Sequence, residues 1–237
     1  MYAVEHPAAN PAAPVIVLVH GLLDSGASFD GVVAELTPEF TVVTYDRRGW
    51  GQSRDDAPPE SLADHAHDAL AVIGERRATV VGHSYGGVVG LMAAFLRPDR
   101  VASVAVFEPT VPWTDWWPAY DEMMERSAAL QPMFRRWREG VPPRTPEVRA
   151  ADEISMGRDF SFVVDAPFDL ADLAVPRLVG SSVDTTPWDY ESGERLADIL
   201  DADLVRFDDA GHTAHRTHPV DFAVFARRAA ALGARRR

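Results

Sequence analysis

One stretch decides the fold of this 237-residue chain: Val80-Val81-Gly82-His83-Ser84-Tyr85-Gly86-Gly87. A β-branched run ends in a serine that has a glycine two residues before it and two residues after it. This Gly-x-Ser-x-Gly spacing is typical of a sharp strand-to-helix turn, the nucleophile elbow. Side chains at the two glycine positions would clash in such a turn. We therefore expect Ser84 to have a strained backbone and to face the unpaired first amides of a following helix.

The flanking segments agree with this interpretation. Residues 78–81 form a short candidate for a buried strand, and residues 88–96 are apolar almost all round, as in a buried helix. Arg97-Pro98-Asp99 then ends the helix. Without this context, the five-residue pattern would equally fit a glycine-rich turn in an ordinary α/β protein.

Three further motifs follow predicted strands in the same way. Residues 15–19 lead into His20-Gly21, residues 41–45 lead into a segment that begins Asp46-Arg47-Arg48-Gly49, and the last strand leads into Ala210-Gly211-His212. With these four ordered motifs, the chain resembles the α/β-hydrolase fold family over nearly its whole length. That fold supports many chemistries, so the resemblance implies an architecture more directly than a substrate.

The predicted elements alternate along the chain. Strands are expected near residues 15–19, 41–45, 78–81, 101–107, 176–179 and 203–207, and helices near residues 28–37, 61–75, 86–96, 192–200 and 219–232. This alternation predicts an α/β fold with a mostly parallel sheet and helices on both faces. Relatives in the family usually have an N-terminal hairpin, which we expect here to be missing or reduced to a fragment near residues 2–5.

The alternation breaks after the fourth strand. We predict an α/β-hydrolase core formed by residues 1–110 and 172–237, with residues 111–171 inserted as a small helical cap. The insertion holds four of the six tryptophans in the chain. These aromatics either anchor the cap on the core or also line an apolar substrate pocket. The candidate pocket residues are Trp113, Trp116, Trp117, Tyr120, Met124 and Trp137.

Composition excludes several other classes of protein. The formal net charge of −13 argues against nucleic-acid or anionic-membrane partners. The chain contains neither cysteine nor lysine, which excludes thiolate nucleophiles, disulfides and lysine Schiff bases. No signal peptide or membrane-length apolar segment is visible, which is compatible with a cytoplasmic enzyme. The glycine pattern is not a dinucleotide fingerprint, so we expect no cofactor.

A serine hydroxyl needs a general base, and the base needs an orienting group. Among the eight histidines, the resemblance places the base at His212. His20 and His83 belong to strand-end motifs and are expected to shape the site, whereas His65 and His67 are expected at the surface. The run Gly-His-x-x-His-x-x-His at residues 211–218 could also suggest a metal site. We disfavour it because the third histidine would be turned away from the first two on a helix.

Two carboxylates could orient the base. The family order of serine, acid and histidine fits Asp184, which follows the strand near residues 176–179 and is the favoured choice. Glu108 follows the preceding strand, a position that a minority of family members use. Asp184 could instead be an exposed loop residue, and Glu108 could instead support the base of the cap.

The oxyanion of an acyl-transfer transition state needs hydrogen-bond donors. The resemblance assigns this role to the backbone amides of Tyr85 and Leu22. The predicted function is therefore a cofactor-independent serine esterase for a small, largely apolar carboxylic ester or lactone. The alternative is a non-hydrolytic enzyme with the same triad, such as a perhydrolase, lyase or biosynthetic cyclase. A degenerate, purely binding relative is disfavoured because Ser84, His212 and a candidate acid are all present. The oligomeric state is left open, and no metal is expected.

Overall fold

The computed structural model describes residues 1–118, 122, 125, 132, 144–164 and 168–235. Its centre is a seven-stranded sheet in the order β1-β3-β2-β4-β5-β6-β7. Only the β1–β3 pair is antiparallel, and the other five pairs are parallel. The strands are β1 Ala3–His6, β2 Val15–Val19, β3 Thr41–Tyr45, β4 Ala78–His83, β5 Val101–Phe107, β6 Arg177–Ser182 and β7 Asp203–Phe207. The prediction of a mostly parallel sheet is confirmed.

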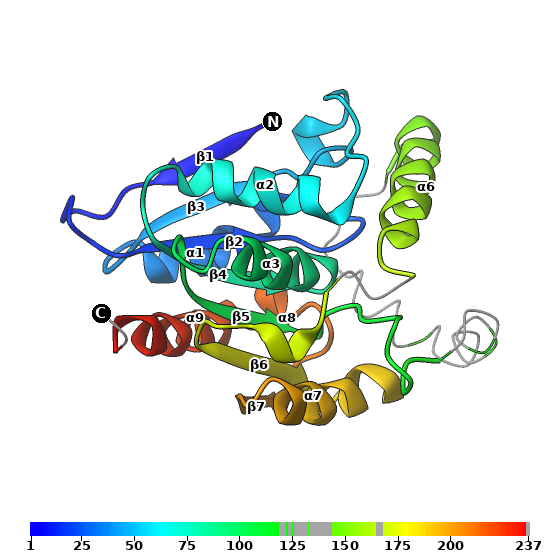
Figure 1. The fold of residues 1–237 in the computed structure, drawn as a ribbon. Coiled ribbons are helices and arrows are strands. Elements are labelled where there is room, and N and C mark those ends of the chain that lie inside the picture. Colours follow the sequence, from blue (N-terminus) through cyan, green and yellow to red (C-terminus); the bar gives the residue numbers. More distant parts are fainter. Residues whose placement is uncertain (119–121, 123–124, 126–131, 133–143, 165–167, 236–237) are drawn as a thin grey trace.

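Helices cover both faces of this sheet (Figure 1). Alternate side chains of β2 show the division, because Val17 packs into one apolar cluster and Leu18 into the other. The first cluster includes α2, α3 and α7, and the second includes α1 and α9. The helices are α1 Asp30–Leu36, α2 Leu62–Ile73, α3 Tyr85–Leu96, α6 Pro146–Ser161, α7 Pro187–Ile199, α8 Ala214–Thr217 and α9 Pro219–Ala234. None of the described helices is long and apolar enough to cross a membrane.

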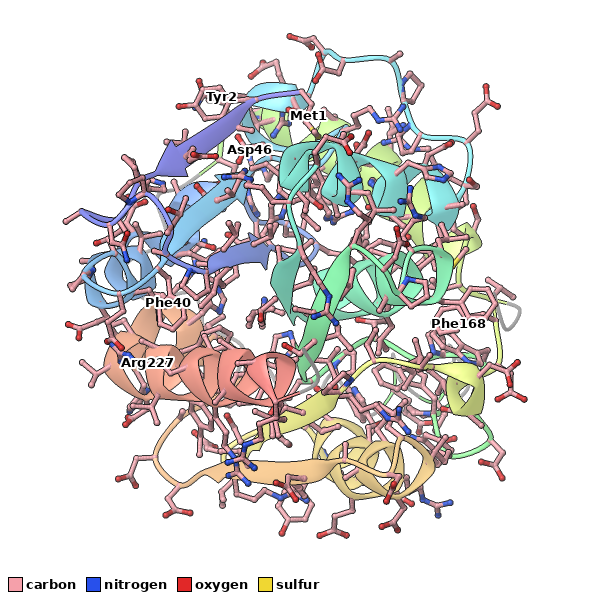
Figure 2. The ribbon with its side chains drawn as sticks, turned by 60° about the vertical axis from the view of Figure 1, so that its left-hand side comes forward. Met1, Tyr2, Phe40, Asp46, Phe168 and Arg227 are labelled. Carbon is pink, nitrogen blue, oxygen red and sulfur yellow. The ribbon has the colours of Figure 1, made fainter. Side chains whose placement is uncertain are left out.

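β1 lies at the position expected for a fragment of the N-terminal hairpin. β1 pairs antiparallel with β3, and the Asp46 amide donates to the Tyr2 carbonyl at 2.9 Å. Figure 2 shows Asp46 beside Met1 and Tyr2 at this edge of the molecule. The Asp46 carboxylate also accepts hydrogen bonds from the amides of Gly26 and Gln52, both at 2.7 Å. Asp46 is thus an anchor for the two loops that follow β2 and β3.

The largest shift of a predicted boundary is at the start of α7. α7 begins at Pro187, five residues earlier than expected, because Thr186 caps it: the Thr186 hydroxyl accepts from the Asp189 amide at 3.1 Å. Within the segment between β5 and β6, α6 begins at Pro146 with Thr145 as its cap. In the sequence, Pro142, Pro143 and Pro146 suggest a loop between two helical parts of the cap. The structure places Pro146 in the first turn of α6 instead, and Pro142 and Pro143 lie outside the described residues.

Candidate active site

Ser84 lies on a sharp turn between β4 and α3. Its φ is +54° and its ψ is −127°, a backbone conformation that residues other than glycine rarely adopt. The turn brings Gly82 so close to Gly86 that a Cβ on Gly82 would overlap the Gly86 carbonyl. A Cβ on Gly86 would likewise overlap the Val19 carbonyl of β2. The two glycines are thus required by close backbone contacts, and the local prediction is confirmed.

Strained backbone gathers at this end of the sheet. Among the described residues, four non-glycine residues have positive φ: Leu23, Ser84, Glu108 and Asp201. Three of them lie in loops at the carboxyl ends of β2, β4 and β5. Such conformations persist where the surrounding structure holds them, and they are concentrated at functional sites. The same edge of a parallel sheet is where ligands bind in open α/β folds.

His212 pairs with Glu108 across 104 positions of sequence. The His212 Nδ1 atom lies 2.7 Å from Glu108 Oε2, so Nδ1–H donates to the carboxylate and Nε2 is left with its lone pair. The contact expected of Asp184 is therefore made by Glu108, and Asp184 is exposed. Glu108, the second candidate, thus lies opposite His212 at the position expected for Asp184.

The physical reason lies in the hydrogen bonds that hold Glu108. Its side chain is buried, and Oε1 accepts from the Ser182 amide at 2.7 Å while Oε2 also accepts from the Thr185 hydroxyl at 2.8 Å. The loop after β6 thus presents donors to the site rather than its own carboxylate. Glu108 also has a positive φ, +45°, which a residue with a side chain rarely adopts.

The pKa of His212 is raised above its ordinary value. Burial alone would lower it, but the Glu108 hydrogen bond and the negative charges of Glu108, Asp189 and Asp24 outweigh burial. Burial raises the pKa of Asp189 to about 7, and the charge of Glu108 adds to this shift against the opposing effects of His212 and Thr186. A carboxylate oxygen of Asp189 lies within 4.8 Å of a carboxylate oxygen of Glu108 and of a ring nitrogen of His212.

This arrangement predicts the pH dependence of turnover. A general base must be neutral, so activity should rise with pH as His212 loses its proton. Because Glu108 stabilises the imidazolium, the midpoint of this rise should lie above the ordinary pKa of histidine. In Glu108→Gln the midpoint should move to lower pH, since the facing negative charge is gone. The measurement is kcat/KM across the neutral range for both proteins. Asp189, Asp24 and His83 are the other titratable groups that face His212, and they stay in place in this variant. A midpoint that does not move would contradict the assignment of the raised pKa to Glu108.

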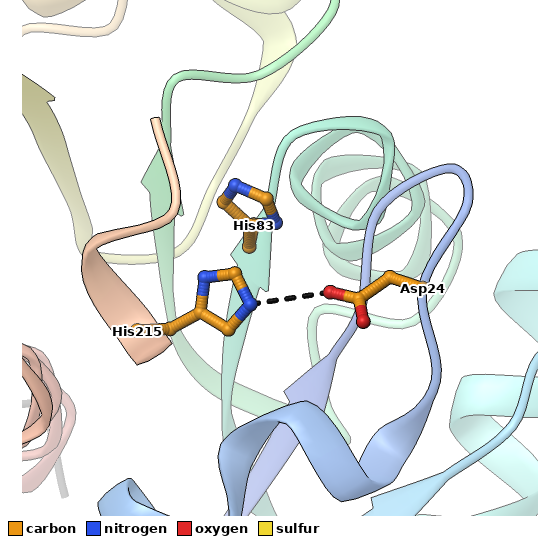
Figure 3. A group of neighbouring side chains, drawn as sticks. All are labelled: Asp24, His83 and His215. Atoms are coloured by element: carbon orange, nitrogen blue, oxygen red, sulfur yellow. Dashed lines mark hydrogen bonds and ion pairs between the residues drawn. The ribbon is translucent and has the colours of Figure 1, made fainter. Parts of the chain in front are cut away.

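Behind His212 lies a cluster of Asp24, His83 and His215, shown in Figure 3. His83 Nε2 lies 2.7 Å from the His212 carbonyl and must donate to it, which fixes the tautomer of His83. Burial, followed by the neighbouring histidines, holds the pKa of His83 well below its ordinary value. His215 Nε2 lies 3.1 Å from Asp24, and Arg216 pairs with the same carboxylate. This cluster holds the His212 loop against the loop after β2.

Within the part of the chain that the structure describes, two groups contain the residue types that could ligate a metal: Asp24 with His83 and His215, and Glu108 with Asp189 and His212. In each group hydrogen bonds already engage a carboxylate, from Arg216 and His215 in the first and from Ser182, Thr185 and His212 in the second. The three histidines of residues 212–218 do not converge. His212 faces Glu108, His215 faces Asp24, and His218 contacts Thr217 at 2.8 Å. Each of these side chains makes at least one hydrogen bond, whereas Nδ1 of His83 and Nδ1 of His215 are buried with no hydrogen-bond partner among the described residues.

The loop after β2 approaches the nucleophile closely. A Cβ on Gly21 would lie 2.9 Å from the Ser84 Cβ, so glycine allows this approach. Leu22 follows directly, and Tyr85 is the first residue of α3. The two residues proposed as oxyanion donors therefore belong to backbone segments that flank Ser84. Thr110, which the sequence did not single out, lies with its Oγ1 3.4 Å from the Ser84 hydroxyl.

The expectation for His65 was wrong. His65 is fully buried on α2, with Nε2 3.1 Å from Asp159 of α6, whereas His67 is exposed as expected. The polar neighbours of His65 in sequence masked a long-range contact with a helix that is distant along the chain. Its pKa is lowered chiefly by burial, with Asp159 acting in the opposite direction.

Three of the predicted pocket aromatics can be placed. Trp113, Trp116 and Trp117 are half-buried and pack against the core, and the Trp116 indole donates to Ser192 of α7 at 3.0 Å. Trp113 and Trp116 also line an open groove of about 490 Å³ with Phe168 and Leu170, among others. Tyr120, Met124 and Trp137 lie outside the described residues.

Comparison with known proteins supports the fold. A family model described as the alpha/beta hydrolase fold matches residues 14–194. RutD of Cronobacter sakazakii, whose name assigns it provisionally as a carbamate hydrolase, is 34% identical over 137 residues, covering 52% of this chain and 51% of that protein. The match thus spans about half the length of this curated relative.

Solved structures resemble nearly the whole chain. An alpha/beta hydrolase from Sphaerobacter thermophilus is 26% identical with a TM-score of 0.69, covering 94% of this chain and 95% of that one. The enol-lactonase from Burkholderia xenovorans LB400 is 22% identical with a TM-score of 0.71, covering 97% and 96%. The second likeness concerns the fold alone.

Proposed function

The chain belongs to the α/β-hydrolase fold family, and from that premise we propose that it is a serine hydrolase of small, largely apolar carboxylic esters or lactones. Ser84 attacks the carbonyl carbon, and His212 Nε2 takes the hydroxyl proton. Glu108 replaces Asp184 as the acid that orients His212. The observation that carries the proposal is the 2.7 Å bond between His212 Nδ1 and Glu108, which places the proton of the neutral ring on Nδ1 and makes Nε2 its basic nitrogen.

The reaction balances in two steps. Attack by Ser84 forms a tetrahedral oxyanion, and the proton held by His212 passes to the leaving alcohol as the acyl-enzyme forms. A water then attacks the acyl-enzyme with His212 again as base, which releases the acid and restores the serine. The amides of Leu22 and Tyr85 are the proposed donors to the oxyanion, and each typically contributes about 10²–10³ in rate.

The proposed substrate class rests on the segment between β5 and β6. We take residues 111–171 as a helical cap, with some of Trp113, Trp116, Trp117, Tyr120, Met124 and Trp137 over Ser84. The half-burial of the three described tryptophans against the core supports an apolar environment. Because one similar protein is provisionally named a carbamate hydrolase and another is named an enol-lactonase, lactones and carbamates should be tested as substrates beside esters. Both present a similar carbonyl to Ser84.

The test is hydrolysis of p-nitrophenyl esters of graded acyl length. Each buried methylene should contribute up to about 0.8 kcal/mol of binding, so kcat/KM should rise over the first few carbons and fall when the pocket is full. Trp117→Ala should move this optimum to longer chains because it removes apolar volume. A preference for charged acyl groups, or an optimum that no tryptophan replacement moves, would contradict the apolar roof.

A further inference from the structure

Arg47 is a fully buried arginine directly after β3. Its Nε donates to the His20 carbonyl and its Nη2 donates to the Gly21 carbonyl, each at 3.0 Å. Both acceptors belong to the loop after β2 that approaches Ser84. The planar guanidinium fork therefore fixes two consecutive peptide groups of this loop at once.

The orientation of these peptides determines where the next amide points. In a trans peptide the carbonyl and the N–H of the following residue point in opposite directions. Because Arg47 holds the Gly21 carbonyl on its own side, the Leu22 N–H is directed to the other side of the same peptide plane. Rotation of this plane would move the carbonyl away from Arg47 and the amide away from its fixed direction together.

His20 reinforces the same peptide. The Arg47 amide donates to His20 Nε2 at 2.9 Å, so the ring proton is on Nδ1, which donates to the Gly21 carbonyl at 2.8 Å. Burial, followed by the charge of Arg47, lowers the pKa of His20 to about 3, so the ring is neutral and keeps this tautomer. The Gly21 carbonyl thus accepts from two buried side chains.

Asp159 of α6 holds Arg47 in turn. The Arg47 Nη1 donates to Asp159 Oδ2 at 2.8 Å, and the Trp50 indole donates to the same oxygen at 3.0 Å, with all three side chains buried. The backbone carbonyl of Asp159 accepts from the Tyr85 hydroxyl at 3.0 Å. One residue of the segment between β5 and β6 is therefore tied to both chain segments that carry the proposed oxyanion donors.

We propose that Arg47 and Asp159 are positioning residues that set the Leu22 amide for the oxyanion, so that placement of α6 controls this donor. The inference rests on the proposed function, since it assumes that an oxyanion forms beside Ser84. If this ion pair were purely structural, its loss would lower the stability of the chain. The enzyme would then still discriminate the transition state from the substrate as well as wild type does.

The experiment compares wild type with Arg47→Lys and Asp159→Asn. Arg47→Lys keeps a buried cation opposite Asp159 but loses the planar fork, and Asp159→Asn keeps the side-chain shape but loses the charge. Asp68→Asn is the control, because it breaks the 2.7 Å ion pair with the adjacent Arg48, which does not hold the loop after β2. For each folded protein, kcat and KM are measured with a p-nitrophenyl ester, and Ki is measured with a trifluoromethyl ketone of matched chain length.

The ketone forms a tetrahedral adduct with serine and needs the oxyanion donors, whereas KM reports substrate binding. In both variants Ki should rise and kcat should fall in parallel, by about 10–100-fold for a misplaced donor, with KM little changed. The control should match wild type. If Asp159→Asn is too unstable to purify, the ratio of Ki to KM in Arg47→Lys alone tests the positioning role.

A ratio of Ki to KM that stays at the wild-type value in Arg47→Lys would overturn the positioning role. A wild-type protein that neither turns over esters nor binds the ketone would instead contradict the proposed function. The two failures are thus distinguishable, because the first is read from a variant of an active enzyme and the second from wild type itself.

Discussion

Ser84→Ala should reduce ester turnover by about 10⁵–10⁶, because members of a nucleophile–base–acid set act as a unit. The fold should survive, since alanine is smaller than serine and its Cβ is strained no more than that of serine at a φ of +54°. The measurement is kcat with a p-nitrophenyl ester, together with a thermal melt. Ser161→Ala is the control, because Ser161 lies exposed at the end of α6 and its hydroxyl contacts only the turn before it among the bonds described.

Retention of more than about a tenth of wild-type kcat in Ser84→Ala would contradict the serine mechanism, since loss of a true nucleophile costs far more than tenfold. A variant that loses both activity and its cooperative melt would report on folding. In that case Ser84→Gly, which accepts positive φ freely, supplies the folded serine-free protein for the same comparison.

Glu108→Gln should have the second largest effect, a loss of about 10³–10⁴ in kcat. The amide group of glutamine can donate toward Nδ1, which would favour the ring tautomer with its proton on Nε2, where it cannot act as base. The matched change is Asp184→Asn, which should stay within a few-fold of wild type because Asp184 is exposed and does not make the 2.7 Å contact. Both variants are compared at the pH of maximal wild-type activity.

The reverse order of these two effects would show that the acid is Asp184 after all and that the loop after β6 rearranges during turnover. A small effect of both changes would mean that neither carboxylate orients the base. Asp189 would then be the group to replace, because it is buried within 4.8 Å of the same histidine.

Local sequence was enough to predict what local sterics control. Gly82 is required by a contact with Gly86 within the same turn, whereas Gly86 is also required by the Val19 carbonyl of the neighbouring strand. Most of the predicted strands follow from short apolar runs rich in valine. The edge where the motifs meet follows from parallel strands alone. The fold and the position of Ser84 could therefore be predicted from the chain itself, whereas the choice of His212 as base rests on the resemblance to the family.

The choice of acid could not be predicted in this way. Asp184 and Glu108 both follow neighbouring strands, and the decision depends on a positive φ at Glu108 and on donors from Ser182 and Thr185, more than seventy residues away. The buried group around Arg47 was missed for a similar reason. Its partner Asp159 is 112 positions distant, and nothing in the sequence around either residue marks it as buried.

The most direct test of the central claim is the mass of the protein after treatment with a fluorophosphonate, followed by mapping of the modified peptide. We expect a single adduct on the Ser84 hydroxyl in wild type, none in Ser84→Ala, and much slower labelling in Glu108→Gln than in Asp184→Asn. An unmodified wild-type protein, or an adduct on another residue that persists in Ser84→Ala, would contradict the central claim.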